Sequence, residues 1–421
     1  MLRADGVLVA DNFQAGILAD DPGTRVEVLS SVVRGTRPGP VGFVGYGLQA
    51  QEGASVRASR VLLLENTDVG VHATNLGTLV DLSDSVVRGT RPRSDGTSGH
   101  GLRAQDGAVL SAARMLVEDC AEAGAYAAGA GALLELTRSI VRGTRPRRDS
   151  AAGYGLGAQE GATLRASGVL IANTADAGIL VLDRGSVADL TACAVRGTRP
   201  RSDGLFGHGI GAVLGSTLSA TAVLVSDVAE VGLFVASGRA QVTDFVGLNI
   251  APNARGLGLG VYAWRGAGVD GTRVALQHVG GAGVAALPFQ GASGSGIVAG
   301  DLYLREVRSS TVRFSDSDRT ARPEGRPVAY GMHAGPGCSI AVTRGVFDQG
   351  GLGFFNAGGT ITLRQGVITR QFEGAGAVDL ATPESRTTLE GVSFLDNATD
   401  TVTRRDDLPT ASELPPSTRS E

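Results

Sequence analysis

The chain has 421 residues, a formal net charge of −4 and 63 glycines, and all 38 of its basic residues are arginine. This charge balance gives no general attraction to polyanions, so nucleic acid is not an expected partner, and lysine chemistry is excluded. No apolar run is long enough to span a bilayer, and no basic segment followed by an apolar one begins at Met1. Aromatic residues make up only 5% of the chain, so a core must consist of valine, leucine, isoleucine and alanine.

The first half of the chain is organised by an internal repeat. The sequence Val-Arg-Gly-Thr-Arg-Pro occurs four times, and successive copies are 54 residues apart. The first arginine of each copy is at Arg34, Arg88, Arg142 and Arg196. Each unit divides into parts of 23 and 31 residues, and both parts alternate apolar and polar residues, as in 56–66 and 80–90. A fixed period with this alternation indicates stacked units made of short strands.

A coil of about 23 residues, with strands separated by Gly and Asn bends, is typical of a parallel β-helix. The additional residues of the longer part, such as 91–99, are predicted to form a loop at one corner of every second coil. We therefore predict an all-β solenoid of roughly fourteen coils with three columns of strands. The regular array covers 1–231, and less regular coils with a long loop near 309–330 cover 232–402. Residues 403–421 are rich in proline and polar residues, and we expect them to be disordered.

The aligned coils predict which side chains face the interior. One bend carries small residues, most of them able to form hydrogen bonds along the stack. These are Thr36, Asn66, Thr90, Cys120, Thr144, Thr174, Thr198 and Val228. Val61, Leu63, Ser85 and Val87 should also point inward. Cys193 falls at a small inward position, so we expect it and Cys120 to be buried, unbridged thiols.

The start of the chain also matches the repeat. Residues 2–10 resemble residues 164–172, so the chain begins inside a coil. Terminal repeats usually carry an atypical capping sequence. We therefore expect either a fragment of a longer protein or a chain that has lost a signal peptide.

The coil length, the Asn-x-x-x-Gly-[Val/Ile] bends at 12–17 and 66–71, and the Gly-Ala turns carry a resemblance. They resemble the right-handed parallel β-helix of the pectin lyase-like superfamily. The resemblance implies a single-stranded right-handed solenoid and an extracellular or cell-surface location. That superfamily includes pectate lyases, polygalacturonases, uronan epimerases, phage tailspikes and surface proteins of unassigned role.

The enzymatic motifs of that superfamily are incomplete in this sequence. The Asn-Thr-Asp at 66–68 and the Gly-His-Gly at 99–101 and 207–209 resemble parts of polygalacturonases. Polygalacturonases also have paired aspartates between these motifs and an Arg-x-Lys after them, but no such pair lies between Asp68 and His100, and Arg-x-Lys is excluded because the chain has no lysine. The histidine of Gly-His-Gly is a repeat position that becomes Tyr46 and Tyr154 in alternate units. Clustered aspartates for calcium are missing from the regular array, so the sequence predicts neither a metal nor a cofactor.

The corner with the long loops is the first candidate binding surface. Its candidate binding residues are Arg91, Arg93, His100, Arg145, Arg147, Tyr154, Arg199, Arg201 and His208. Alternate coils would repeat this set roughly every 10 Å, together with the acidic residues Asp95, Asp149 and Asp203. Rings stack on sugar faces and guanidiniums hold carboxylates, so a long acidic or neutral glycan could lie there. The alternative is a set of solvated loops whose arginines and aspartates pair locally.

The second candidate surface lies where the period breaks, at 313–333. It contains Asp316, Asp318 and His333, and paired carboxylates are what a glycosidase or lyase needs. The same composition also describes an ordinary hydrophilic loop.

Three functions remain open at this point. The first is a secreted or cell-surface protein that acts as a structural scaffold or a non-catalytic glycan-binding surface. The second is a polysaccharide lyase, glycoside hydrolase or uronan epimerase. The third is an adhesin or tailspike-like fibre module, which would need trimer contacts that a sequence does not show. The candidate partner is a polysaccharide, and the oligomeric state is left open.

Overall fold

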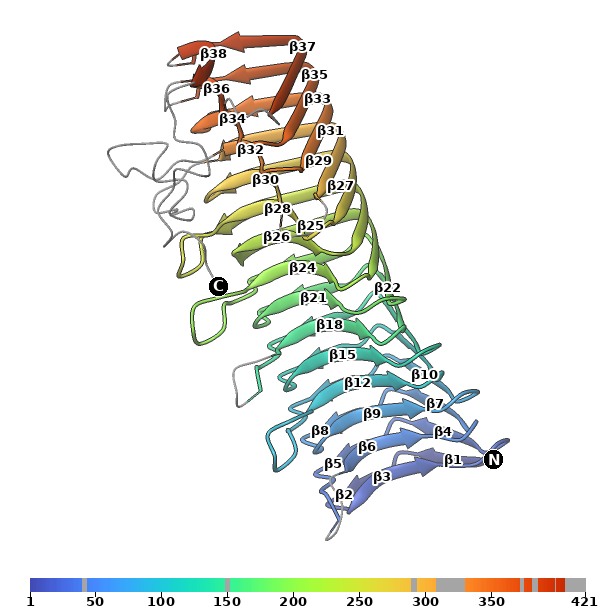
Figure 1. Ribbon diagram of the computed structural model, residues 1–421. Helices are drawn as coiled ribbons and strands as arrows, with labels where there is room; N and C mark the ends of the chain where they lie inside the picture. The colour runs from blue at the N-terminus through green and yellow to red at the C-terminus, as the bar shows by residue number, and fades with distance from the viewer. Residues whose placement is uncertain are drawn as a thin grey trace. The chain divides into compact units, whose positions relative to one another are not determined.

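The computed structural model describes residues 1–39, 44–147, 152–288, 294–307, 330–371, 375–380, 385–397 and 399–405. The regular elements in these segments are all β-strands (Figure 1). The chain forms two compact units, residues 1–202 with 210–223 and residues 203–209 with 224–421. The predicted long loop near 309–330 and most of the predicted disordered tail lie outside the described residues.

Each coil of the first unit contributes one strand to each of three columns. The first column consists of β3 (Gln14–Ala19), β6 (Gly45–Ala50), β9 (Val69–Thr74), β12 (His100–Gln105), β15 (Ala123–Ala128), β18 (Tyr154–Gln159) and β21 (Ala177–Val181), followed by β24 (His208–Val213). The second consists of β1 (Leu2–Asp5), β4 (Arg25–Leu29), β7 (Ser55–Ser59), β10 (Leu79–Ser83), β13 (Val109–Ala113), β16 (Leu133–Thr137), β19 (Thr163–Ser167) and β22 (Val187–Thr191). The third consists of β2 (Leu8–Ala10), β5 (Val32–Arg34), β8 (Leu62–Leu64), β11 (Val86–Arg88), β14 (Leu116–Glu118), β17 (Ile140–Arg142), β20 (Leu170–Ala172) and β23 (Ala194–Arg196).

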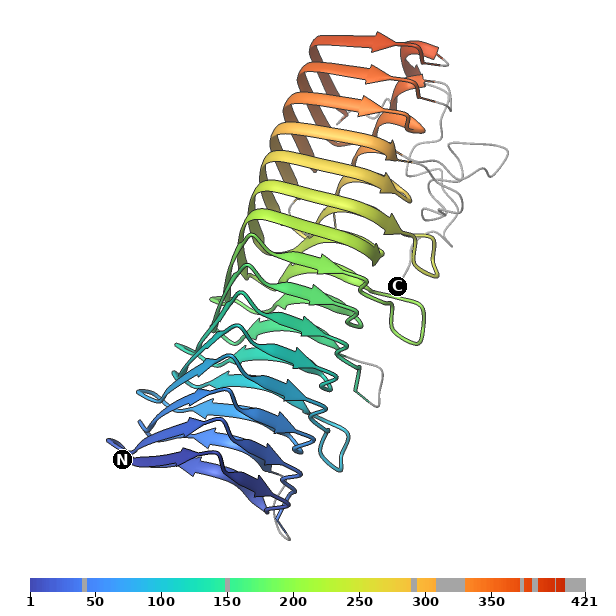
Figure 2. The same ribbon diagram turned by 180° about the vertical axis from the view of Figure 1, so that it is seen from behind.

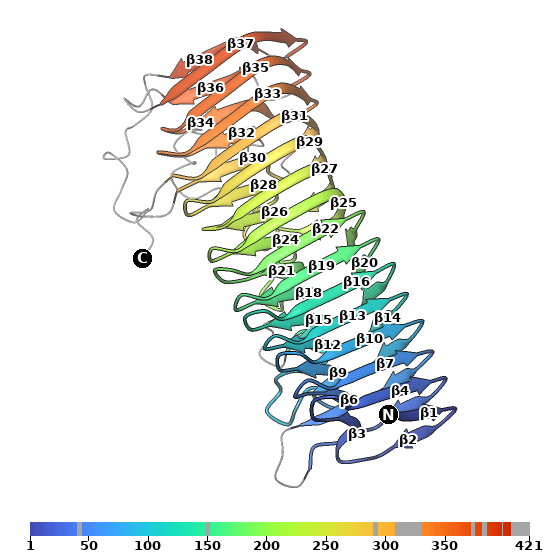
Figure 3. The same cartoon turned by 90° about the vertical axis from the view of Figure 1, so that its right-hand side faces the viewer.

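Equivalent strands of neighbouring coils pair in parallel and in register. Val56 lies opposite Val80 in the second column, and Leu63 lies opposite Val87 in the third. Figure 3 shows second-column strands of the first unit side by side, with third-column strands next to them. The predicted loop 91–99 projects at the corner between the third and first columns (Figure 1). The parallel solenoid and the three predicted columns are thereby confirmed for the first unit.

The second unit has two columns of strands instead of the three that we predicted. One column consists of β26 (Val231–Ala236), β28 (Leu259–Trp264), β30 (Ala282–Leu287), β32 (Tyr330–Ala334), β34 (Leu352–Asn356), β36 (Ala375–Leu380) and β38 (Thr399–Arg405). The other column consists of long strands, β27 (Arg239–Ala251), β29 (Gly268–Val279), β31 (Gly296–Val307), β33 (Ser339–Asp348), β35 (Thr360–Thr369) and β37 (Arg386–Leu395), and β25 (Thr217–Ala229) is long in the same way. Figure 2 shows these long strands bending.

The long strands form because ladder pairing continues on both sides of the bend. Asp244 and Arg273 occupy the bend with left-handed φ values of 54°. Thr243 pairs with Thr272 before the bend, and Phe245 pairs with Val274 after it. Within the described residues the strands from β3 to β24 in the column listed first and those from β26 to β38 in the second unit number fifteen, close to the roughly fourteen coils predicted.

The predicted interior positions are confirmed. Val61, Leu63, Ser85 and Val87 are at most 2% exposed. All eight residues predicted at the polar bend are also buried, from Thr36 to Val228.

The polar bend forms a ladder of hydrogen bonds between neighbouring coils. The Thr36 amide donates to Asn66 Oδ1 at 3.1 Å, and Asn66 Nδ2 donates to the Val33 carbonyl at 3.3 Å. The Cys120 thiol lies 3.6 Å from Thr90 Oγ1. Buried polar groups are costly unless they are paired, so these bonds offset part of the cost of placing polar side chains in a narrow apolar core. Thr36 Oγ1 and Thr144 Oγ1 are buried without a hydrogen-bond partner among the described residues.

The cysteines are buried and free of disulfides, as predicted for Cys120 and Cys193. Cys338, whose position was not predicted, is also buried. Burial raises the pKa of the Cys120 thiol to about 11. The thiolate is the nucleophilic form, so these thiols are inert in the folded chain at neutral pH.

Candidate functional site

The first arginine of each repeat points outward from the third column of the first unit. Arg34, Leu64, Arg88, Glu118, Arg142, Ala172 and Arg196 follow one another in register along this face. Glu118 accepts hydrogen bonds from both Arg88 and Arg142, the latter with an Nη2–Oε2 distance of 2.6 Å. Burial opposes ionisation of Glu118, but the two guanidiniums outweigh it and its pKa lies below the usual value.

The second arginine of each repeat lies just after the third column and leans toward the preceding coil. The four equivalent residues are Arg37, Arg91, Arg145 and Arg199. Arg37 Nη2 lies 3.3 Å from Asp11 Oδ1, and Arg91 donates to Glu65. Arg145 Nη2 donates to the backbone carbonyl of Asp119 at 2.7 Å. The position equivalent to Glu65 in the last repeat is Asn173, so the carboxylate is replaced by a neutral amide there.

We call these two sets of arginines together the arginine corner. It consists of Arg34, Arg37, Arg88, Arg91, Arg142, Arg145, Arg196 and Arg199, all exposed. The first arginines form one row of positions from coil to coil, the second arginines form another, and the bend residues between them form a third. The carboxylates in these three rows are Asp11, Glu65, Glu118 and Asp119. Eight guanidiniums thus face four carboxylates, and the pattern recurs every second coil, roughly 10 Å. The corner therefore carries an excess of positive charge although the chain as a whole is acidic.

The third arginine of the repeat fastens the long loop instead of facing solvent. The Arg93 guanidinium contacts both carboxylate oxygens of Asp68 at 2.9 Å, and the Asp68 side chain is 0% exposed. Arg201 pairs in the same way with buried Asp176, at 2.7 Å. Arg147 lies 3.7 Å from Glu122. The predicted local pairing with loop aspartates such as Asp95 is therefore replaced by pairing with an acid 25 residues earlier, on the preceding coil.

The two histidines of the candidate set are covered. His100 is 4% exposed, its Nε2 lies 3.6 Å from Glu122, and its ring packs on Tyr126 with centroids 5.0 Å apart. His208 is 5% exposed and packs in the same way on Phe234, again with centroids 5.0 Å apart. The expected stacking of sugars on these two rings is not possible in this arrangement, because their faces are not at the surface. Tyr154 is half-buried.

The rings that cover one another lie at a fixed spacing in the sequence. Each ring packs against a residue 26 positions later, on the next coil: Tyr46 on His72, and His100 on Tyr126. Adjacent first-column strands place these residues on one outward face, where a ring of one coil lies beside a ring of the next. A search for aromatic pairs at this spacing would have found them.

One such pair belongs to a polar cluster that the sequence analysis missed. His72 is 5% exposed and lies in register with Arg103 of the next coil. Burial, with Arg103 nearby, lowers the pKa of His72 to about 3. Burial also raises the pKa of Tyr46, which lies near Asp68 and Arg93. The cluster places a neutral imidazole and a phenol near the guanidiniums of Arg93 and Arg103.

The second candidate surface is only partly described. Asp316 and Asp318 lie outside the described residues, so their grouping with His333 stays a prediction. His333 itself is 4% exposed and packs against Tyr330 and Phe355, with centroid distances of 5.4 and 5.2 Å. Burial lowers the pKa of His333 to about 4, so its imidazole is neutral at physiological pH.

No protein-family model matches this chain, and no curated protein matches it in sequence. In the part of the chain that the structure describes, no helix has the length and hydrophobicity needed to cross a membrane. The same part contains no group of three or more His, Cys, Asp or Glu side chains placed to hold a metal ion.

Proposed function

We propose that this protein is a non-catalytic β-helix scaffold that binds an anionic polysaccharide along the arginine corner of its first unit. The observation that supports this proposal most is the excess of exposed guanidiniums over carboxylates in the three rows of that corner. A secreted or cell-surface location, as the resemblance to pectin lyase-like proteins implies, belongs to the same proposal.

Guanidiniums suit this task because their forked N–H groups match the two oxygens of a carboxylate. The pair that Arg91 now forms with Glu65 is exposed, with side-chain exposures of 60% for Arg91 and 62% for Glu65. Exposed ion pairs contribute about 0–1 kcal/mol, so a uronate can displace Glu65 at little cost. The position equivalent to Glu65 is Asn173 in the repeat of Arg199, so an incoming carboxylate would meet no carboxylate from that position there.

A rigid repeat turns weak contacts into useful affinity. A uronate polymer bound at one repeat meets the next at high effective concentration, so long chains should bind much better than short oligomers. Rising salt should weaken binding, because the contacts are between exposed charges.

The test compares two triple variants with the native protein on immobilised uronate polymers. One variant changes Arg91, Arg145 and Arg199 to alanine. The matched control changes Arg57, Arg114 and Arg165, which lie outside the corner and have side-chain exposures of 74%, 54% and 55%. If each corner arginine contributes about 0.5 kcal/mol, the corner variant should bind about tenfold more weakly and the control should bind normally.

Two results would contradict the proposal. Equal loss in both triple variants would show that only net charge matters. Equal binding by the corner variant and the native protein, or binding by neither, would leave the arginine corner as solvated surface and the protein as a scaffold alone.

A polysaccharide lyase or uronan epimerase is the second candidate function, and the cluster around His72 favours it. Such enzymes move a proton at a uronate, and Tyr46 and His72 are a phenol and a neutral imidazole near the guanidiniums of Arg93 and Arg103. Both rings are covered and His72 is a weak base, so this function requires the ring pair to open when the polymer binds. The test is incubation with polyuronates, followed by detection of unsaturated ends or of an altered uronate epimer. Product formation that His72→Ala abolishes would establish this function, and no product from any polymer would exclude it for the polymers tested.

A further inference from the structure

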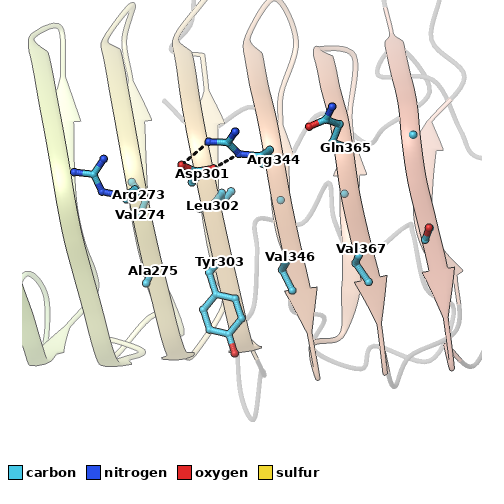
Figure 4. Close-up of a pocket in the computed structure, with 14 residues that line it drawn as sticks. Arg273, Val274, Ala275, Asp301, Leu302, Tyr303, Arg344, Val346, Gln365 and Val367 are labelled. Atoms are coloured by element: carbon cyan, nitrogen blue, oxygen red, sulfur yellow. Dashed lines mark hydrogen bonds and ion pairs between the residues drawn. The ribbon is translucent and has the colours of Figure 1, made fainter.

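The second unit has a groove on its outer surface, far in sequence from the arginine corner. It has a volume of about 580 Å³ and follows the bend of the long strands β29, β31, β33, β35 and β37. Figure 4 shows its side chains in two rows, a polar one and an apolar one, each running from coil to coil. The groove is open, so any ligand would lie along the surface and contact several coils at once.

The polar row is electrically balanced. Arg344 donates to both oxygens of Asp301, with an Nη2–Oδ2 distance of 2.9 Å, and Arg273 binds Asp244 in the same way at 2.5 and 2.7 Å. The hydrogen bonds from Arg344 lower the pKa of Asp301, so the carboxylate is ionised at neutral pH. Gln365 continues the row as a neutral amide (Figure 4). Each guanidinium has five N–H donors and each carboxylate about four acceptor sites, so both keep hydrogen-bonding capacity after pairing.

The apolar row lies beside it on the same strands. Ala275, Tyr303, Val346 and Val367 are successive register partners. Tyr303 and Val346 are each 38% exposed. Between the two rows, buried Leu302 is followed in register by Gly345 and Gly366. A Cβ at either glycine would meet the buried side chains of Phe347 or Leu363, so this row faces the core and only its backbone lines the groove.

These two rows define the chemistry of a ligand. Two guanidiniums and two carboxylates balance in the polar row, whereas the arginine corner has eight guanidiniums for four carboxylates. A charged ligand would therefore meet as much repulsion as attraction in the groove. The ligand that fits is uncharged, extended, apolar on one side and rich in hydroxyl groups on the other. A linear chain of neutral pyranoses has this character, since its C–H faces can cover a tyrosine ring while its hydroxyls bind planar polar side chains.

We propose that this groove binds a neutral linear polysaccharide. Tyr303 forms the stacking platform, Val346 and Val367 extend it, and Asp301, Arg344 and Gln365 bind the hydroxyl edge. Equivalent positions recur once per coil, about 4.8 Å apart, so successive sugars meet similar groups. This inference is independent of the arginine corner, because it concerns the other unit and a ligand without charge.

The experiment is calorimetric titration of the full chain with soluble β-glucan, xylan and mannan oligosaccharides, and with a polyuronate for comparison. At least one neutral oligosaccharide should bind, and binding should change little with salt because no net charge is neutralised. Tyr303→Ala should weaken it about tenfold, while Tyr303→Phe keeps the ring and should retain most of the affinity. Val298→Ala is the matched control, because Val298 is 52% exposed on the same strand but does not line the groove.

Three outcomes would overturn the proposal. The first is that no neutral oligosaccharide binds. The second is that Tyr303→Ala binds as well as the native chain, or loses no more affinity than Val298→Ala. The third is that sedimentation shows self-association which Tyr303→Ala abolishes, because a second copy would then occupy the groove. Circular dichroism of each variant checks that it is folded, so that a loss of binding can be assigned to the groove. If the chain binds a neutral oligosaccharide but no polyuronate, the proposal for the arginine corner fails and the proposal for the groove stands.

Discussion

The pairing of Arg93 with Asp68 allows one stability prediction to be worked out in detail. Substituting Arg93 by methionine keeps the aliphatic stem but removes the guanidinium, and leaves the carboxylate of Asp68 without its partner. Losing one member of a buried pair usually costs about 3–5 kcal/mol. The Asp68 side chain is 0% exposed and that of Arg93 is 25% exposed, so water reaches only the arginine side of the pair. We expect a loss near the lower limit, about 3 kcal/mol.

A neighbouring arginine supplies the control. Arg91 belongs to the same loop, but it and Glu65 are 60% and 62% exposed, so Arg91→Met should cost about 0–1 kcal/mol. The double substitution of Asp68→Asn with Arg93→Met should recover part of the loss, because no buried charge then remains unpaired.

Two measurements check this prediction. Urea unfolding gives the loss in stability, and hydrogen exchange locates it. The Gly99 amide donates to the Asp68 carbonyl at 2.8 Å, and the Arg93 amide donates to the Thr97 carbonyl at 2.9 Å. Both amides should exchange faster in Arg93→Met than in Arg91→Met. The reasoning is refuted if the two variants unfold within about 0.5 kcal/mol of each other, since buried and exposed pairs would then be equivalent.

Three further predictions concern the core and the charged rows. The Cys120 thiol, with its pKa raised to about 11, should resist labelling until denaturant is added, and rapid labelling of the native chain would contradict its burial. Gly70→Ala should cost about 1–3 kcal/mol in thermal unfolding, because the new Cβ would lie 2.5 Å from Val87 Cγ1, whereas Gly268→Ala meets nothing within 4 Å. Glu118 has a lowered pKa, so its stabilisation is complete above the unfolded value of about 4.3 and is lost as the pH falls through the folded value. An acid titration of stability should therefore be flatter in Glu118→Gln, and identical curves would exclude a role for this carboxylate.

The interior could be predicted from the sequence because it depends only on alternation and period. Leu63 and Val87 are predicted inward from their place in the coil, and any register that keeps the period gives the same answer. The hydrogen-bonding bend follows in the same way from the alignment of Thr36, Asn66 and Thr90.

The charged and aromatic pairs could not be predicted in this way, because each joins residues of two coils. Arg93 lies two positions from Asp95 in the sequence, yet its side chain contacts Asp68. Which acid it reaches depends on the direction in which the side chain leaves the corner, and alternation does not determine that direction. The same holds for His100, which turns toward Tyr126 and becomes covered. The long strands that replace the second and third columns in the second unit could not be predicted either, because long bent strands and separate short strands have the same alternation of apolar and polar residues.

The pairing between coils has a consequence for how this protein can change its length. Asp68 and Arg93 are 25 residues apart, as are Asp176 and Arg201, and the pairs recur at multiples of the 54-residue unit. Gain or loss of a whole unit by recombination therefore brings an acid opposite an arginine again, wherever the exchange occurs. Loss of a single coil would instead bury an acid with no arginine on the next coil, at a cost of several kcal/mol. Genes for such chains should therefore vary in steps of two coils, and viable variants with an odd number should be rare.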